Sequence, residues 1–116
     1  MGLEEKTCAE CPPGTQPFDG EMVTRYLSEL ETPWEAVRGE QIRREFVFGT
    51  FRDAIGFVDD VAELAEREDH HPMLHIFCEK VVVVLWTNSI GGLSENDFIV
   101  ARKIELIEKR RAGARA

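Results

Sequence analysis

The strongest fold signal lies in the second half of the sequence, where residues 66–97 read EREDHHPMLHIFCEKVVVVLWTNSIGGLSEND. Two runs inside this stretch, Leu74–Glu79 and Val81–Thr87, are rich in β-branched or aromatic residues and predict two adjacent strands. The second run is apolar on both faces from Val81 to Trp86, so we expect it to be a central strand of a sheet rather than an edge strand.

A helix precedes this pair of strands. Thr50 can cap it, with Asp53 three residues further on, and apolar residues then recur at helical spacing. The helix should end near residues 66–68, because Pro72 disfavours helical geometry at the residue before it.

A second helix follows the strands. Gly91-Gly92 breaks the chain, and Ser94 with Asp97 forms another capping box at the helix start. This helix should reach about Arg111.

The first half of the chain predicts a helix and two further strands. The helix should begin at Asp19 and end at Thr32-Pro33, and the strands Trp34–Val37 and Ile42–Phe48 follow, with Arg38-Gly39 as turn material. The predicted order is therefore α-β-β-α-β-β-α. Such a chain packs most simply as an α+β, two-layer fold, in which a four-stranded antiparallel sheet carries the helices on one face.

We expect one folded domain over residues 18–111. Residues 1–17 contain the breaker Pro12-Pro13-Gly14 and are expected to form a flexible leader, and residues 112–116 are expected to form a frayed tail. The chain of 116 residues is long enough for a single ordinary core.

The composition excludes some classes of partner. The chain has 14 Lys and Arg against 22 Asp and Glu, a formal net charge of −8, so we expect no basic face for nucleic acid or for an anionic membrane surface. The sequence shows no run of about 18 apolar residues and no export signal, and it therefore predicts a cytoplasmic protein without a membrane span.

The three cysteines, Cys8, Cys11 and Cys78, cannot form a disulfide framework, which fits a reducing compartment. Cys8 and Cys11 have the spacing of a zinc half-site or of a redox dithiol. Four-ligand zinc needs two more ligands, and no second CxxC or HxxxH follows. We therefore expect no metal, and favour a leader that happens to carry two thiols.

The most unusual stretch is Asp69-His70-His71-Pro72, which places two adjacent imidazoles at a helix-to-strand junction. The two rings must point in different directions, and histidine can transfer protons near neutral pH. Glu66 lies four residues before His70 and can orient that imidazole if the helix persists so far. A surface turn whose histidines bond nearby carbonyls explains the same residues. A metal site is disfavoured, because adjacent histidines do not readily chelate one ion.

A known family shows this combination of motifs. Glu66-x-x-x-His70-His71-Pro72, an apolar hairpin and the run 91–98 (GGLSENDF) together resemble the pterin-4a-carbinolamine dehydratases, also known as the dimerisation-cofactor family. The likeness spans about residues 19–107 and includes Trp34 and the phrase Arg44-Glu45-Phe46-x-Phe48. It implies a subunit that pairs into dimers or tetramers. It also implies an enzyme that needs no cofactor and removes water from a 4a-hydroxytetrahydropterin.

The resemblance implies roles for individual residues. His70 would transfer protons, His71 would help to hold the pterin, and Glu66 would act as orienter. Three further residues match family positions and belong to the expected substrate site: Trp34, Pro72 and Asp97. Packing also explains Trp34, and the capping box also explains Asp97.

The sequence departs from the family at two positions. A further family histidine, which shares the proton transfer, is replaced by Asn88, and an aromatic residue is replaced by Cys78. An amide cannot exchange protons at neutral pH, so we expect dehydration to be weak or absent. The spare imidazole of His75 shares a strand face with Phe77 and Glu79, and we do not expect it to replace the missing group.

Two functions remain open at this point. The first is a slow pterin dehydratase with an incomplete catalytic set that includes Asn88. The second is a non-catalytic protein of the same fold that binds other proteins. The family is known to include a coactivator of homeodomain transcription factors and bacterial relatives that resemble Rubisco assembly factors of carboxysomes. In the second case Rubisco subunits are the candidate partner and the carboxysome is a candidate location.

Overall fold

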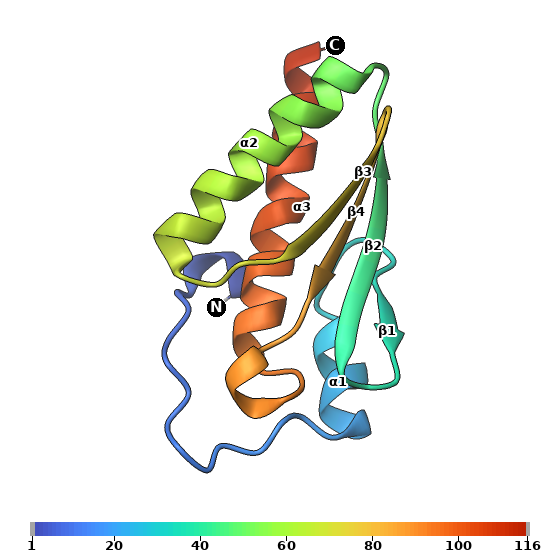
Figure 1. The fold of residues 1–116 in the computed structure, drawn as a ribbon. Helices are drawn as coiled ribbons and strands as arrows, with labels where there is room; N and C mark the ends of the chain where they lie inside the picture. Colours follow the sequence, from blue (N-terminus) through green and yellow to red (C-terminus); the bar gives the residue numbers. More distant parts are fainter. Residues whose placement is uncertain (1, 116) are drawn as a thin grey trace.

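The computed structural model describes the backbone of residues 2–115 and the side chains of residues 2–112. The elements follow in the order η1 (Leu3–Glu5), α1 (Gly20–Leu27), β1 (Glu35–Val37), β2 (Gln41–Val47), α2 (Phe51–Glu68), β3 (Met73–Phe77), β4 (Lys80–Leu85), η2 (Asn88–Ile90) and α3 (Glu95–Arg115), where η marks a short 3-10 helix. The α-helices and strands follow the predicted order, and the fold is α+β (Figure 1).

The sheet has four antiparallel strands in the order β1-β2-β4-β3. The predicted central position of β4 is confirmed, because β2 and β3 pair with its two sides at Phe46 and Ile76, which both lie opposite Val81. Cys78 adopts a left-handed backbone conformation with φ of 49°. This residue and Glu79 form the hairpin turn, so β3 ends at Phe77 rather than at Glu79.

The core lies between the sheet and the helices on one of its faces (Figure 1). Val81, Val83 and Leu85 alternate along β4 and are fully buried, and Phe46 of β2 packs on Phe57 of α2 with ring centroids 4.8 Å apart. Alternation of this kind places every second strand residue against the helices. None of the described helices is long and apolar enough to cross a lipid bilayer.

Two helix ends differ from the sequence expectation. α1 ends at Leu27, several residues before Thr32-Pro33, because the next residues form turns in which Glu29 and Leu30 donate to the carbonyls three residues back. α3 continues to Arg115, beyond the expected end at Arg111, while residue 116 of the predicted tail lies outside the described residues.

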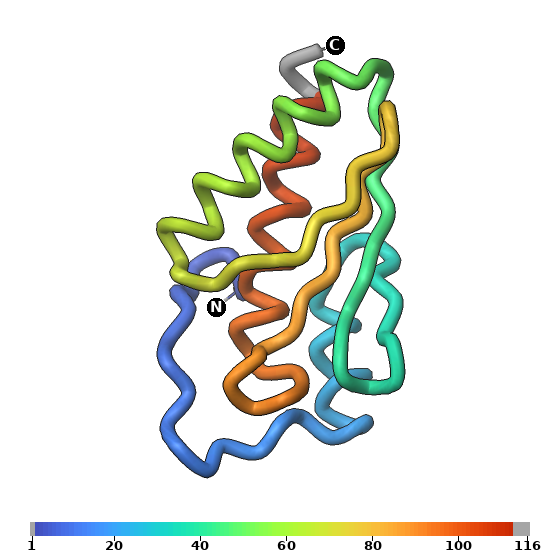
Figure 2. Tube along the Cα trace, in the orientation of Figure 1, coloured from blue at the N-terminus to red at the C-terminus, as the bar shows by residue number. Residues whose placement is uncertain are grey.

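The described part of the segment before α1 contains η1 and otherwise irregular backbone, and it makes contacts with the rest of the chain. Leu3 is 3% exposed and belongs to the main core. Lys6 pairs with Glu95 at the start of α3 at 2.7 Å. Figure 2 shows this segment passing beside the α2–β3 junction and below η2 before it reaches α1.

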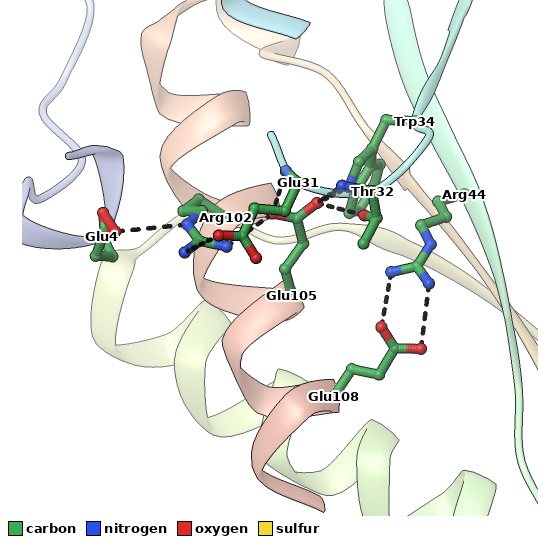
Figure 3. Close-up of polar contacts among 8 residues, drawn as sticks. All are labelled: Glu4, Glu31, Thr32, Trp34, Arg44, Arg102, Glu105 and Glu108. Atoms are coloured by element: carbon green, nitrogen blue, oxygen red, sulfur yellow. Dashed lines mark hydrogen bonds and ion pairs between the residues drawn. The ribbon is translucent and has the colours of Figure 1, made fainter. Parts of the chain in front are cut away.

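A buried carboxylate on α3 organises the loop between α1 and β1 (Figure 3). Glu105 is 4% exposed and accepts hydrogen bonds from the backbone N–H groups of Glu31 and Thr32, from the Thr32 hydroxyl and from Nε1 of Trp34. Arg102 balances its charge at 3.1 Å. Trp34 is buried in the core, and its ring meets Phe46 edge-on.

A second ion pair fixes α3 against the sheet. The Arg44 guanidinium donates to both carboxylate oxygens of Glu108, at 2.9 and 3.2 Å (Figure 3). A two-pronged bond of this kind constrains orientation as well as distance. Together with the Glu105 contacts, it sets the position of α3, whose first turn carries part of the candidate site.

Candidate active site

The junction between α2 and β3 turns the two histidines in opposite directions. α2 ends at Glu68, and Asp69 adopts a left-handed conformation with φ of 51° and ψ of 43°. The N–H groups of Asp69 and His70 both donate to the carbonyl of Ala65, which closes the helix end. The side chain of His70 then points inward and is 12% exposed, whereas that of His71 is 56% exposed. The expected divergence of the two rings is confirmed.

His70 is held by a buried carboxylate on α3. Its Nε2 lies 2.6 Å from Oδ1 of Asp97, which is fully buried. The other oxygen of Asp97 accepts hydrogen bonds from the Thr87 hydroxyl at 2.8 Å and from the Ser94 N–H at 3.0 Å. An ionised carboxylate only accepts hydrogen bonds, so with Asp97 ionised this contact requires the proton of His70 on Nε2, and Nδ1 is then the ring nitrogen that can exchange protons. The Ser94–Asp97 bond is also the predicted reciprocal bond of the capping box.

Glu66 does not orient His70, contrary to the expectation from sequence. Its Oε2 lies 2.5 Å from Nε2 of His71 instead, and both side chains are largely exposed. The expectation failed because the left-handed Asp69 ends helical spacing one residue before His70. Asp97 takes the orienting position that the sequence analysis gave to Glu66.

A cavity of about 400 Å³ lies beside His70. Its lining comes from the α2–β3 junction, the η2 turn, the first turn of α3 and the segment before α1: Cys8, Ala9, Glu10, Cys11, Glu68, Asp69, His70, Thr87, Ser89 and Asn96. The cavity therefore joins residues 8–11, 68–70 and 87–96, three parts of the chain that are far apart in sequence. The segment before α1 is the part that sequence reasoning did not place there.

Three other residues that were expected at the site do not line this cavity: Asn88, Pro72 and Trp34. Asn88 is exposed at the start of η2, between the lining residues Thr87 and Ser89, and is not itself among the lining residues. Pro72 is half-buried just before β3 and does not line the cavity, and Trp34 lies in the core against Glu105.

Two titratable groups at the edge of the cavity are strongly coupled. Burial raises the pKa of the Cys8 thiol to about 12, and the carboxylate of Glu68 adds to this effect. Burial by itself raises the pKa of Glu68, but hydrogen bonds from the Cys8 N–H and from Lys103 outweigh burial and hold that pKa below its usual range. At neutral pH Cys8 is therefore a neutral thiol and Glu68 a carboxylate. Among the described side chains, no three His, Cys, Asp or Glu residues are placed to hold a metal ion.

Known proteins are similar to this chain in sequence and in fold. Residues 16–107 match the family model described as Pterin 4 alpha carbinolamine dehydratase. Two of the relatives that carry the name "Putative pterin-4-alpha-carbinolamine dehydratase" come from Alkaliphilus metalliredigens and Rubrobacter xylanophilus. The one from Alkaliphilus metalliredigens is 38% identical over 103 residues, which are 89% of this chain and 93% of the relative. The one from Rubrobacter xylanophilus is 39% identical over 103 residues, which are 89% of this chain and 95% of the relative.

Solved structures also share the fold. A transcriptional coactivator/pterin dehydratase from Brucella melitensis is 34% identical with a TM-score of 0.74, over 79% of this chain and 98% of that one. A pterin dehydratase-like protein identified as a RuBisCO assembly factor in the alpha-carboxysome is 19% identical with a TM-score of 0.57, over 66% of this chain and 90% of that one, a likeness of fold alone. Because the family model covers the whole sheet and most of each long helix, and relatives of that name match along nearly their full length, the chain belongs to the pterin-4-alpha-carbinolamine dehydratase family.

Proposed function

We propose that the chain binds a reduced pterin in the cavity beside His70 and dehydrates 4a-hydroxytetrahydropterins slowly. The observation that carries this proposal is the His70–Asp97 pair, in which an imidazole that lines the cavity is hydrogen-bonded to a fully buried carboxylate. A fixed imidazole with one nitrogen free for proton exchange is a suitable general acid or base.

The reaction needs two proton transfers. The 4a-hydroxyl must gain a proton to leave as water, and a ring nitrogen of the pterin must lose one to give the quinonoid dihydropterin. His70 serves one of these transfers, and the Asp97 carboxylate stabilises the imidazolium charge that forms when His70 holds the extra proton. No bond to the protein and no cofactor is required.

The second transfer lacks a dedicated group. Asn88 cannot act as an acid or base, His75 lies exposed on the edge strand β3, and the Cys8 thiol, with its pKa of about 12, is a poor base at neutral pH. Losing one general catalyst removes roughly 10²- to 10⁴-fold of rate. The proposed activity is therefore weak, with water as the second proton carrier.

A dehydration assay with 4a-hydroxytetrahydrobiopterin tests this proposal. The native protein should accelerate the reaction above buffer, and His70→Gln should return the rate to the buffer value. His75→Gln is the matched control, because it removes an exposed imidazole outside the cavity, and it should behave as the native protein. No acceleration by the native protein, together with no pterin binding in calorimetry, would disprove the function.

The second candidate function is protein binding without catalysis. The observation that favours it is the apolar surface of the edge strand β3, where Met73, Ile76 and Phe77 are 42%, 41% and 67% exposed. An edge strand offers unpaired backbone groups to another strand. We propose that a second copy of the chain covers this edge in a cytoplasmic dimer or tetramer, and that Rubisco subunits are the first external partner to examine.

Two variants separate these functions. Phe77→Lys places a charge on the exposed edge and should reduce the oligomer in sedimentation velocity, with little effect on the monomer fold because the side chain is largely outside the core. If the chain is an assembly factor, Phe77→Lys should abolish its support of Rubisco assembly in co-expression with Rubisco subunits, and His70→Gln should not. If the chain is an enzyme, His70→Gln should abolish dehydration and Phe77→Lys should not. A monomeric native protein would refute the proposed covering of β3.

A further inference from the structure

The segment of residues 8–11, which we call the strap, forms one side of the cavity at His70. All four of its residues line that cavity. The strap lies before residues 16–107, the part of the chain that matches the family model. It carries the Cys8-x-x-Cys11 motif, for which the proposed dehydratase chemistry has no use.

The strap is held in place by specific hydrogen bonds. Asn96, in the first turn of α3, accepts from the Ala9 N–H at 3.1 Å and donates its amide to the Ala9 carbonyl at 2.7 Å. The N–H of Cys8 donates to Glu68 at 2.8 Å, and Lys103 fixes the other oxygen of Glu68 at 2.6 Å. An amide side chain that bonds both backbone groups of one residue fixes that residue as a neighbouring strand would. The strap is therefore a built wall with defined anchors.

The contacts of Cys8 and Cys11 indicate a structural role in the cavity lining rather than a reactive one. The Cys8 thiol donates to the Asn96 carbonyl at 3.6 Å, and Cys11 lies 4.0 Å from the Asn96 amide nitrogen. Both sulfurs thus contact the residue that anchors the strap. Small, weakly polar side chains in this position fill space at the cavity wall without adding charge.

The lining of the cavity contains more acidic than basic side chains. Glu10, Glu68 and Asp69 are among the described residues that line it and no lysine or arginine is, although Lys103 pairs with Glu68 from outside the lining. Thr87, Ser89 and Asn96 add neutral hydrogen-bonding groups. A phosphorylated ligand would bring negative charge against carboxylates, which is unfavourable at close range. A neutral or cationic heterocycle rich in N–H donors fits this surface.

We propose that the strap determines the ligand specificity of the cavity at His70, which accepts an unphosphorylated heterocycle rich in hydrogen-bond donors. Asn96 is the positioning residue that holds the strap over this cavity. The identity of the heterocycle as a pterin rests on the proposed function. The closure of the cavity by the strap does not.

The closure is tested without any ligand. The protein has three histidines, so the three imidazole Hε1 signals can be followed by NMR in the presence of a soluble paramagnetic agent. Asn96→Ala should raise the relaxation of the His70 signal several-fold, while the signals of the exposed His71 and His75 stay unchanged. Lys109→Ala, an exposed change further along α3, is the matched control and should have no effect. Equal relaxation of His70 in the native and Asn96→Ala proteins would overturn the proposal.

A second variant controls for the possibility that the Asn96 substitution disturbs α3. Ala9→Pro removes the donated N–H from the strap side and leaves every residue of α3 in place. It should expose His70 in part, because the bond from the Asn96 amide to the Ala9 carbonyl remains. If Ala9→Pro leaves His70 protected, the strap does not cover the cavity and the proposal fails.

Calorimetry then tests the specificity. The native protein should bind 7,8-dihydrobiopterin and reject 7,8-dihydroneopterin triphosphate, and Asn96→Ala should bind the former several-fold more weakly. Tighter native binding of the triphosphate, or unchanged dihydrobiopterin affinity in a variant whose His70 is exposed, would overturn the proposed ligand specificity. If the native protein binds neither compound, the proposed function fails, and the relaxation of His70 still decides whether the strap closes the cavity.

Discussion

Asp97→Asn is the sharpest test of the His70–Asp97 pair, because it keeps the shape of a fully buried side chain and changes only its charge and one acceptor. The carboxylate accepts three hydrogen bonds, from His70, Thr87 and Ser94. If the amide oxygen stays with Thr87 and Ser94, the amide NH₂ faces Nε2 of His70, and the imidazole must change tautomer to accept it.

The expected loss of stability follows from these bonds. One charge-assisted hydrogen bond contributes about 1.5–3 kcal/mol, and the two retained bonds weaken when their acceptor becomes neutral, so we expect the free energy of unfolding to fall by about 2–4 kcal/mol. Dehydration should fall to the buffer rate, since an amide behind a catalytic histidine selects the wrong tautomer and in serine-protease triads costs on the order of 10⁴-fold.

Urea unfolding followed by circular dichroism measures the first effect, and the dehydration assay measures the second. Glu66→Gln is the matched control, because it makes the same chemical change beside the exposed His71. An exposed ion pair contributes about 0–1 kcal/mol, so this variant should be close to the native protein in both assays. Equal losses in the two variants would refute the distinction between a buried functional pair and an exposed one.

Three further predictions concern the missing base, the α3 carboxylate and acid stability. Asn88→His should raise dehydration by roughly 10²- to 10⁴-fold in the same assay, and an unchanged rate would show that more than one part of the site is lost. Glu105→Gln should lower the free energy of urea unfolding by about 1.5–3 kcal/mol, since it weakens charge-assisted bonds to the loop before β1. The folded-state pKa of Glu68 is lowered, because bonds from Cys8 and Lys103 outweigh burial, so its contribution to stability is present above its unfolded pKa and is lost as pH falls through the folded value. The acid loss of stability in urea titrations should therefore be shallower in Glu68→Gln, and identical pH profiles would contradict the shift.

Local rules predicted most of the fold. The N-terminal caps are confirmed: Asp19 accepts from the Met22 N–H at 2.9 Å, and Thr50 accepts from the Asp53 N–H at 3.1 Å. Each of these bonds joins residues three positions apart, so the local sequence pattern is sufficient to predict it. The continuous apolar run of β4 likewise predicted its central position, and β2 and β3 pair with its two edges.

The candidate site was only partly predictable, because it depends on contacts between distant residues. The pairing of His70 with Asp97 joins residues 27 apart, and the bond between Cys8 and Glu68 joins residues 60 apart. The spacing that suggested a Glu66–His70 contact assumes an unbroken helix, and the left-handed Asp69 removes that assumption. A carboxylate such as Asp97 looks like an ordinary helix cap in the sequence, and its contacts with His70 and Thr87 arise only in the folded structure.

The position of α3 has a consequence for how the chain acquires its structure during synthesis. Glu105 secures the loop before β1, Glu108 secures β2 and Asn96 secures the strap, although all three partners leave the ribosome many residues earlier. The loop, the strand and the strap therefore lack these hydrogen bonds until α3 has emerged from the ribosome. A nascent chain stalled before residue 95 should remain open to protease, and protection should arise in one step when α3 docks.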